Sequence, residues 1–155
     1  MATKTVLNCL VETHKHVKEV QRNINIFIRE LINRGEKHDD SKFEEPELTV
    51  FAENTEKLGA TEYGSEEYKV LLEQVKPAIT NHYAKNRHHP EHWANGINDM
   101  TLVDLLEMIA DWKAATKRNK DGNIRTSIEK NSDRYRIDPQ LRQILENTVR
   151  EHFTE

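Results

Sequence analysis

The sequence predicts an all-α fold, a single compact bundle of about five to seven helices over residues 1–155. The 155 residues include only five glycines and four prolines, which is too few for a turn-rich β protein. Apolar residues recur three and four positions apart along much of the chain, and no stretch alternates apolar and polar residues as a half-buried strand would. The length is that of one ordinary domain, so we expect a single hydrophobic core.

The first long helix is predicted from about residue 4 to Arg34. Gly35 comes next and suits the position just after the end of a helix. Apolar residues recur three or four positions apart in this segment, as one face of a helix requires: Val17, Val20, Ile24, Phe27 and Leu31.

A short segment over residues 38–43 is predicted to separate the first helix from the second. Pro46 suits the first position of the second helix, which should end near residue 59. A loop is expected over residues 59–64, and Ser65 can then cap a third helix.

The third helix should end before Pro90, because a proline disfavours helical backbone at the residue that precedes it. Pro77 lies inside the helical pattern and is expected to kink or restart the helix. Residues 89–100 are predicted to form an irregular connection. Thr101 and Asp104 have the spacing of a capping box and should begin a strongly apolar helix.

The last third of the chain is predicted to hold two more helices. Asp121-Gly122 is typical of a turn, and a short helix is expected over residues 127–133. Asp138 followed by Pro139 has the form of an N-cap and a first helical residue. The apolar stripe of this final helix is made by Leu141, Ile144, Leu145, Val149 and Phe153.

The composition narrows the class of protein. A net charge of −4 argues against nonspecific nucleic-acid binding. The single cysteine, Cys9, cannot form an internal disulfide and fits a reducing compartment. No signal peptide and no run of about 20 apolar residues is present, so we expect a cytoplasmic protein without a membrane partner, in the host cytoplasm if a phage encodes it.

Eight histidines are a high count for 155 residues, and they gather in groups. Neutral imidazole is a common ligand of borderline divalent metals, and no cysteine pair competes for that role. The histidines therefore favour a divalent ion of Mn, Fe, Co, Ni or Zn. Seven of the eight are His14 and His16, then His38, then His82, His88, His89 and His92.

The stretch His38-Asp39-Asp40-Ser41-Lys42 is a candidate metal and phosphate site. His38 and Asp39 can converge on an ion that lies between them, beyond the surface of a helical turn. Lys42 shares their face, so its ammonium is placed to approach a phosphate. A solvated loop is the alternative interpretation of so short a motif.

A second acidic group lies on the predicted helix that follows Thr101. Asp104, Glu107 and Asp111 are spaced to share one face of that helix. Neighbouring carboxylates repel one another unless a cation neutralises them, and a metal would serve. An exposed acidic stripe is the alternative.

The order of His16, then His38-Asp39-x-x-Lys42, then a distant helical Asp111 resembles the HD superfamily of metal-dependent phosphohydrolases. That resemblance implies a helical bundle with one or two metal ions at its centre. It also implies that His16, His38, Asp39 and Asp111 are the metal ligands.

Some branches of that superfamily add a second ion through histidines between the His-Asp pair and the last Asp, where this chain has His82, His88 and His89. The adjacent pair at 88 and 89 resembles the paired histidines of the branch that hydrolyses cyclic dinucleotides, although Pro90-Glu-His-Trp replaces that branch's Gly-Tyr-Pro signature. The whole chain also resembles an uncharacterised family common in phage and bacterial genomes. The shared motifs are His-Asp-x-Ser-Lys-Phe, Asn-x-His-His-Pro-Glu-His and Glu-Met-x-x-Asp-Trp-x-Ala-Ala.

The leading functional hypothesis is metal-dependent hydrolysis of a nucleotide or related small phosphoester by a metal-activated water. Asp39 and Lys42 are the candidate catalytic residues, and Lys42, Arg87 and Arg118 are the candidate substrate contacts. Glu47 and Glu107 are candidate supporting acids.

Two alternatives stay open: a di-iron, HD-type oxygenase, and a non-catalytic helical protein of phage or bacterial origin with a structural or vestigial site. Trp93 and Trp112 could line a base-stacking pocket or belong to the core. The substrate, the metal, the number of ions and a homodimeric state are left open as well.

Overall fold

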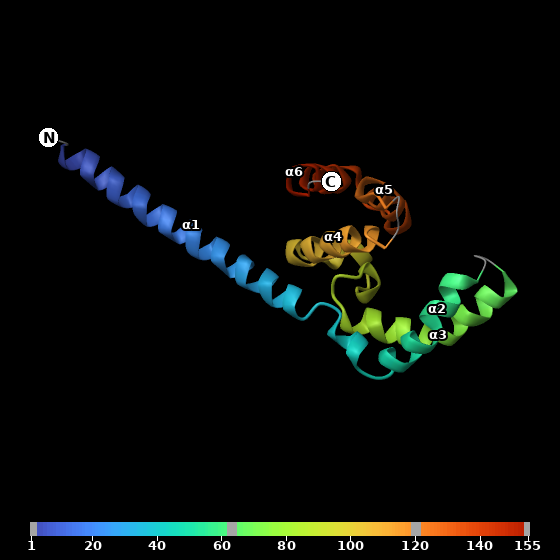
Figure 1. The fold of residues 1–155 in the computed structure, drawn as a ribbon. Helices are drawn as coiled ribbons and strands as arrows, with labels where there is room; N and C mark the ends of the chain where they lie inside the picture. Colours follow the sequence, from blue (N-terminus) through green and yellow to red (C-terminus); the bar gives the residue numbers. More distant parts are fainter. Residues whose placement is uncertain (1–2, 62–64, 119–121, 154–155) are drawn as a thin grey trace. The chain divides into compact units, whose positions relative to one another are not determined.

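The computed structural model describes residues 3–61, 65–118 and 122–153, and in these ranges it contains six α-helices, three short 3-10 helices and no strand (Figure 1). The predicted all-α fold with five to seven helices is therefore confirmed. Contacts within the chain divide it into two units, Met1–Lys37 and His38–Glu155, and each unit is described by itself.

The first unit is essentially one helix, α1 (Lys4–Glu36). The Thr3 hydroxyl caps its first turn by accepting a hydrogen bond from the Val6 N–H at 3.4 Å. The helix runs through Gly35, so the predicted stop at Arg34 comes two residues early. No left-handed backbone is needed there, because the cap is Lys37.

The second unit begins with the 3-10 turn η1 (Asp40–Phe43), which is followed by α2 (Glu47–Ala60) and α3 (Glu66–Lys85). Helices α2 and α3 pack against each other, and η1 packs against both. Pro46 is the N-cap of α2 rather than its first helical residue. Ser65 caps α3 as predicted, and its hydroxyl accepts from the Tyr68 N–H at 3.1 Å.

The predicted loop over residues 59–64 is only partly described. Helix α2 extends to residue 60, and residues 62–64 lie outside the described ranges. Pro77 neither ends nor restarts α3. It lies on the exposed side of the helix together with Glu73, whose carbonyl loses its helical partner, so water can satisfy that carbonyl.

The connection after α3 is ordered by two short 3-10 turns, η2 (Pro90–His92) and η3 (Gly96–Asp99). It leads into α4 (Leu102–Thr116), which begins with the predicted capping box: the Thr101 hydroxyl accepts from the Asp104 N–H, and the Asp104 carboxylate accepts from the Thr101 N–H.

The last two helices are α5 (Ile124–Tyr135) and α6 (Pro139–His152). Helix α5 starts before the predicted residue 127, because the Asn123 side chain caps it by accepting from the Arg125 N–H at 2.8 Å. Asp138 caps α6 as predicted. The predicted turn at 121–122 falls partly on residue 121, which lies outside the described ranges.

The hydrophobic core of the second unit lies among α4, α5 and α6. Trp112 packs against this core and stacks on Tyr135, with ring centroids 6.4 Å apart. Within the described ranges, no helix combines the length and the apolar character that crossing a membrane demands. The fully or nearly buried core residues are Leu105, Met108, Ile109, Ile124, Ile128, Ile137, Leu145 and Val149.

Candidate metal centre

The candidate centre is built around Asp39, which lies between α1 and η1. Its backbone is left-handed, with φ 60° and ψ 20°, a conformation that aspartate and asparagine adopt more readily than most residues. Lys42, one 3-10 turn further on, donates a 2.6 Å hydrogen bond to Asp39 Oδ2. The other oxygen, Oδ1, is buried and has no hydrogen-bond partner among the described residues.

Three imidazoles converge on that free oxygen. His82 comes from the last turn of α3, and His88 and His89 come from the connection that follows it. Asp39 Oδ1 lies 3.4 Å from His82 Nε2 and 3.5 Å from His88 Nε2, while His82 Nε2 and His89 Nε2 are 2.9 Å apart. One ligand atom from each of these four residues falls within 4.8 Å of the others.

The spacing and chemistry of this group fit a divalent metal. Ligands about 2.1 Å from an ion are separated from one another by about 3.0 Å in octahedral and about 3.4 Å in tetrahedral geometry. The observed separations of 2.9–3.5 Å fall at these values. His88 Nε2 is buried without a hydrogen-bond partner among the described residues, which would be costly unless a cation accepts its lone pair.

Glu47, at the start of α2, fixes the orientation of His82. Its carboxylate is 0% exposed and accepts a 2.9 Å hydrogen bond from His82 Nδ1. The same carboxylate accepts from Ser41 Oγ at 2.9 Å and from Asn81 Nδ2 at 2.8 Å. Because Nδ1 carries the proton in this arrangement, the His82 Nε2 lone pair faces the cluster, as in many histidine metal ligands.

Glu107, in α4, contacts the Nδ1 atoms of two other histidines, His38 and His88. Its Oε1 accepts from His38 Nδ1 at 3.0 Å and lies 3.1 Å from His88 Nδ1. His38 Nε2 then faces two carboxylates, 3.6 Å from Asp39 Oδ2 and 3.7 Å from Asp111 Oδ1. Hydrogen bonds to Asp111 and Glu107 raise the pKa of His38 to about 10. Negative charge is therefore in excess here, and a bound cation would compensate it.

Electrostatics favour the protonation states that metal ligation needs in the rest of the cluster. Burial lowers the pKa of His89 to about 3 and also lowers the pKa of His82, so both rings are neutral at pH 7. Burial is the largest effect and would raise the pKa of Asp39, but the Lys42 hydrogen bond and the nearby charges of Lys42 and His38 together lower it. For Asp111, burial is likewise the largest effect, but the hydrogen bond to His38 and the neighbouring imidazoles together lower the pKa, so both acids are ionised.

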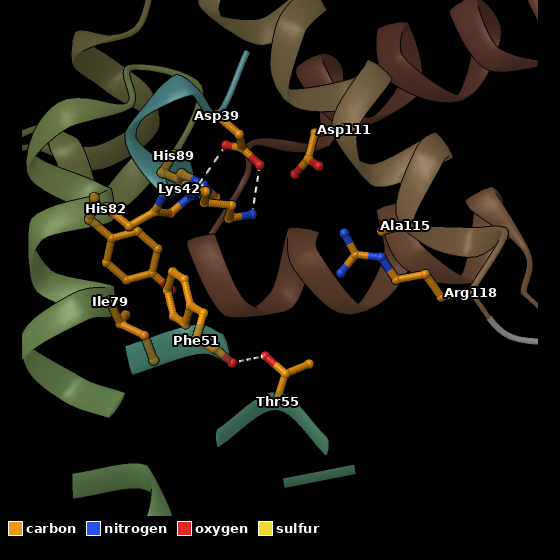
Figure 2. Close-up of a pocket in the computed structure, with 11 residues that line it drawn as sticks. Asp39, Lys42, Phe51, Thr55, Ile79, His82, His89, Asp111, Ala115 and Arg118 are labelled. Carbon is orange, nitrogen blue, oxygen red and sulfur yellow. Dashed lines mark hydrogen bonds and ion pairs between the residues drawn. The ribbon is translucent and has the colours of Figure 1, made fainter. Parts of the chain in front are cut away.

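The cluster forms one wall of a cavity of about 600 Å³ (Figure 2). Helices α2 and α3 contribute apolar side chains to the cavity, while Arg118 enters from the end of α4. A cavity of this size holds a small organic ligand. It is lined by Asp39, Lys42, Phe51, Thr55, Ile79, His82, Tyr83, His89, Asp111, Ala115 and Arg118.

Arg87 does not line this cavity. Its Nε and Nη2 donate to the buried Asp104 carboxylate at 3.1 and 3.2 Å, and its guanidinium stacks on Trp93 with the carbon 4.4 Å from the ring centroid. These contacts replace the phosphate contact predicted for Arg87 and explain why Asp104 can be buried. Neither Trp93 nor Trp112 lines the cavity, and aromatic side chains from α2 and α3 do so instead.

The second unit holds six of the seven predicted ligands. Asp39, His82, His88 and His89 form one group of converging ligand atoms, and His38 forms another with His88 and Glu107. Asp111 is in neither group, although its Oδ1 lies 3.7 Å from His38 Nε2. His16 lies in α1, in the first unit. Its role as a ligand stays a prediction. His92 points away from the cluster, since its Nδ1 lies 2.9 Å from the Tyr83 carbonyl oxygen.

Sequence reasoning missed the neutral residues that support the centre. Ser41 and Asn86 are both buried, and Asn86 Nδ2 donates to Ser41 Oγ at 2.8 Å and to the His82 carbonyl at 2.8 Å. Asn86 lies four residues after His82, which is one helical turn. That spacing next to a candidate ligand could have indicated a supporting role for Asn86.

Fold and site together define an all-α protein with a buried histidine–carboxylate cluster at a ligand-sized cavity. The chain belongs to a family of unknown function, DUF5662, whose sequence profile matches residues 5–151. Comparison with curated proteins and with solved structures gave no match.

Proposed function

We propose that the second unit is a metal-dependent phosphohydrolase that acts on a nucleotide or a related small phosphoester. The observation that carries this proposal is the convergence of Asp39, His82, His88 and His89 at the wall of a cavity that also holds two basic side chains. The ordered motifs that resemble the HD superfamily support the same reaction class.

The chain's own residues have distinct parts in this proposal. A divalent ion held by the cluster would supply Lewis acidity and lower the pKa of a bound water. Lys42, at the cavity wall, would neutralise charge that develops on the phosphate. The ionised Asp111 carboxylate also faces the cavity and is placed to accept a proton from the attacking water.

Two groups of ligand atoms share His88, the first with Asp39, His82 and His89 and the second with His38 and Glu107. This sharing makes a centre with two ions the second candidate, and iron in both positions would favour oxygen chemistry. The distinguishing result is tightly bound iron with oxygen consumption and no phosphate release.

The proposal is tested by metal analysis of the purified protein together with phosphate release from a panel of nucleotides. Asp39→Asn and His88→Gln should each reduce the bound metal to a small fraction and lower phosphate release at least about 100-fold, because each removes a ligand. His152→Gln, on the exposed side of α6, is the matched control and should change neither.

Bound metal and phosphate release that survive both substitutions would refute the assignment. A protein that binds no divalent ion at all would favour the non-catalytic alternative.

A further inference from the structure

The cavity is lined by one lysine and one arginine, and only the lysine has an ion-pair partner among the described residues. Lys42 is already paired, because its ammonium donates to Asp39 Oδ2 at 2.6 Å. Arg118 lines the same cavity, and no side chain in residues 3–61, 65–118 and 122–153 forms an ion pair or a hydrogen bond with its guanidinium. Figure 2 shows the Arg118 side chain pointing into the cavity, toward the side that carries Lys42 and Phe51.

The surroundings of Arg118 leave room for a ligand group. Ala115, one turn earlier on α4, also lines the cavity, and its methyl group fills little space. Thr55 on α2 adds a hydroxyl at this end, although it donates to the Phe51 carbonyl at 2.6 Å. A guanidinium presents five donors in a planar fork that matches phosphate and carboxylate, and the described part of the chain leaves this fork unused.

The same cavity also has an apolar part of its lining, next to the metal cluster. Phe51 from α2 and Ile79 and Tyr83 from α3 line the cavity beside His82 and His89. The Tyr83 ring stands 5.0 Å from the His89 ring, and the Phe51 ring stands 6.4 Å from the His82 ring. A flat apolar group, such as a base or a sugar face, can pack against these side chains while charged groups of the same ligand reach the metal cluster and Arg118.

We propose that the cavity recognises a substrate with two anionic groups, in which the scissile phosphate lies at the metal cluster and a second phosphate binds Arg118. This inference rests on the proposed function, because that function places the scissile phosphate. Arg118 is then a specificity-determining residue, which favours substrates whose leaving group is itself charged.

The test is equilibrium binding by calorimetry, measured on chelator-treated protein and again after metal loading. The probes are adenosine 5′-monophosphate, adenosine 5′-diphosphate and adenosine 3′,5′-bisphosphate. The last two differ in whether the second phosphate adjoins the first or lies across the ribose, so they report where Arg118 reaches. Variants are Arg118→Ala and Arg118→Lys, with Arg125→Ala, at an exposed position of α5, as the control.

At least one doubly phosphorylated probe should bind the wild-type protein about 10-fold more tightly than the monophosphate, as expected for one charge-assisted bidentate contact. Arg118→Ala should abolish that advantage and change monophosphate affinity less than about twofold. Arg118→Lys should keep part of the advantage because the charge remains, and Arg125→Ala should keep all of it. Thermal melts should be unchanged, because Arg118 is exposed.

Equal weakening of all three probes by Arg118→Ala would place Arg118 on the scissile phosphate and overturn the inference, as would a wild-type protein without preference for a second phosphate. An Arg118-dependent preference without phosphate release under any metal would support the inference while the proposed hydrolysis fails. Phosphate release without that preference would support the proposed hydrolysis and overturn the inference about Arg118.

Discussion

Replacing Glu47 by glutamine should weaken metal binding while leaving the fold intact. Glu47 is fully buried, and its two oxygens accept hydrogen bonds from His82 Nδ1, Ser41 Oγ and Asn81 Nδ2 at 2.8–2.9 Å. Glutamine keeps one oxygen, which can still accept from His82 and Ser41. Its amide would then face Asn81, whose side chain can turn so that its own oxygen accepts.

The expected loss follows from the charge and not from the shape. A carboxylate behind an imidazole raises the basicity of the ligating nitrogen, and removing such a partner typically costs 10- to 100-fold in metal affinity. Because every hydrogen-bonding position at Glu47 can still be filled, the free energy of unfolding of the metal-free protein should change by only about 1 kcal/mol. Glu47→Ala would instead leave buried donors unpaired and should cost about 1–3 kcal/mol.

Competition with a chromophoric chelator measures the affinity, and denaturant unfolding of the metal-free protein measures the stability. Glu53→Gln, on an exposed part of α2, is the control and should change neither quantity. A Glu47→Gln protein that binds metal within about twofold of wild type would refute the reasoning, since His82 would then need no carboxylate behind it.

Four further predictions concern stability. Asp104→Asn removes the charge that holds Arg87 and should lower the free energy of unfolding by about 1–3 kcal/mol in a denaturant titration. Burial and, second, the Glu91 carboxylate raise the pKa of Tyr135 above its ordinary value of 10.0. The neutral phenol therefore stabilises the fold fully below pH 10, and the free energy of unfolding should decrease as the pH rises above 10. Tyr135→Phe should make the stability depend less on pH in thermal melts recorded between about pH 9 and 11. The same dependence on pH in the variant would show that another group causes it. Pro77→Ala should raise the free energy of unfolding by roughly 2 kcal/mol, because the hydrogen bond that α3 regains outweighs the opposing effect of a freer unfolded chain. A chelator should lower the melting temperature of the metal-loaded protein, since a ligand at about 100 times its Kd stabilises by about 2.7 kcal/mol; an identical melting curve would show that no such ion was bound.

Helices were predictable from the sequence because their signals are local. Apolar spacing located the helices, and the caps at Ser65, Thr101 and Asp138 placed three starts correctly. Two details differ from the prediction. Helix α3 does not restart at Pro77, which is exposed, and α5 begins before the predicted residue 127 because Asn123 caps it.

Much of the candidate site was also visible, since histidine and aspartate indicate metal chemistry by residue type alone. The partners of long polar side chains were not predictable in the same way. Arg87 precedes two candidate ligands, yet its guanidinium turns to Asp104, seventeen positions later, because the connection after α3 runs past the start of α4. Likewise, Phe51 and Tyr83 line the cavity only through the way α2 packs on α3, which no local pattern encodes.

The left-handed backbone at Asp39 limits how this family can diverge. Most side chains at that position would strain the chain where it enters η1, whereas asparagine adopts the same conformation at little cost and carries no charge. Under the proposed function, a relative that lost metal binding but kept the architecture would therefore most readily carry asparagine in place of this aspartate. One amino-acid letter at this position would then distinguish such a relative from one that binds the ion.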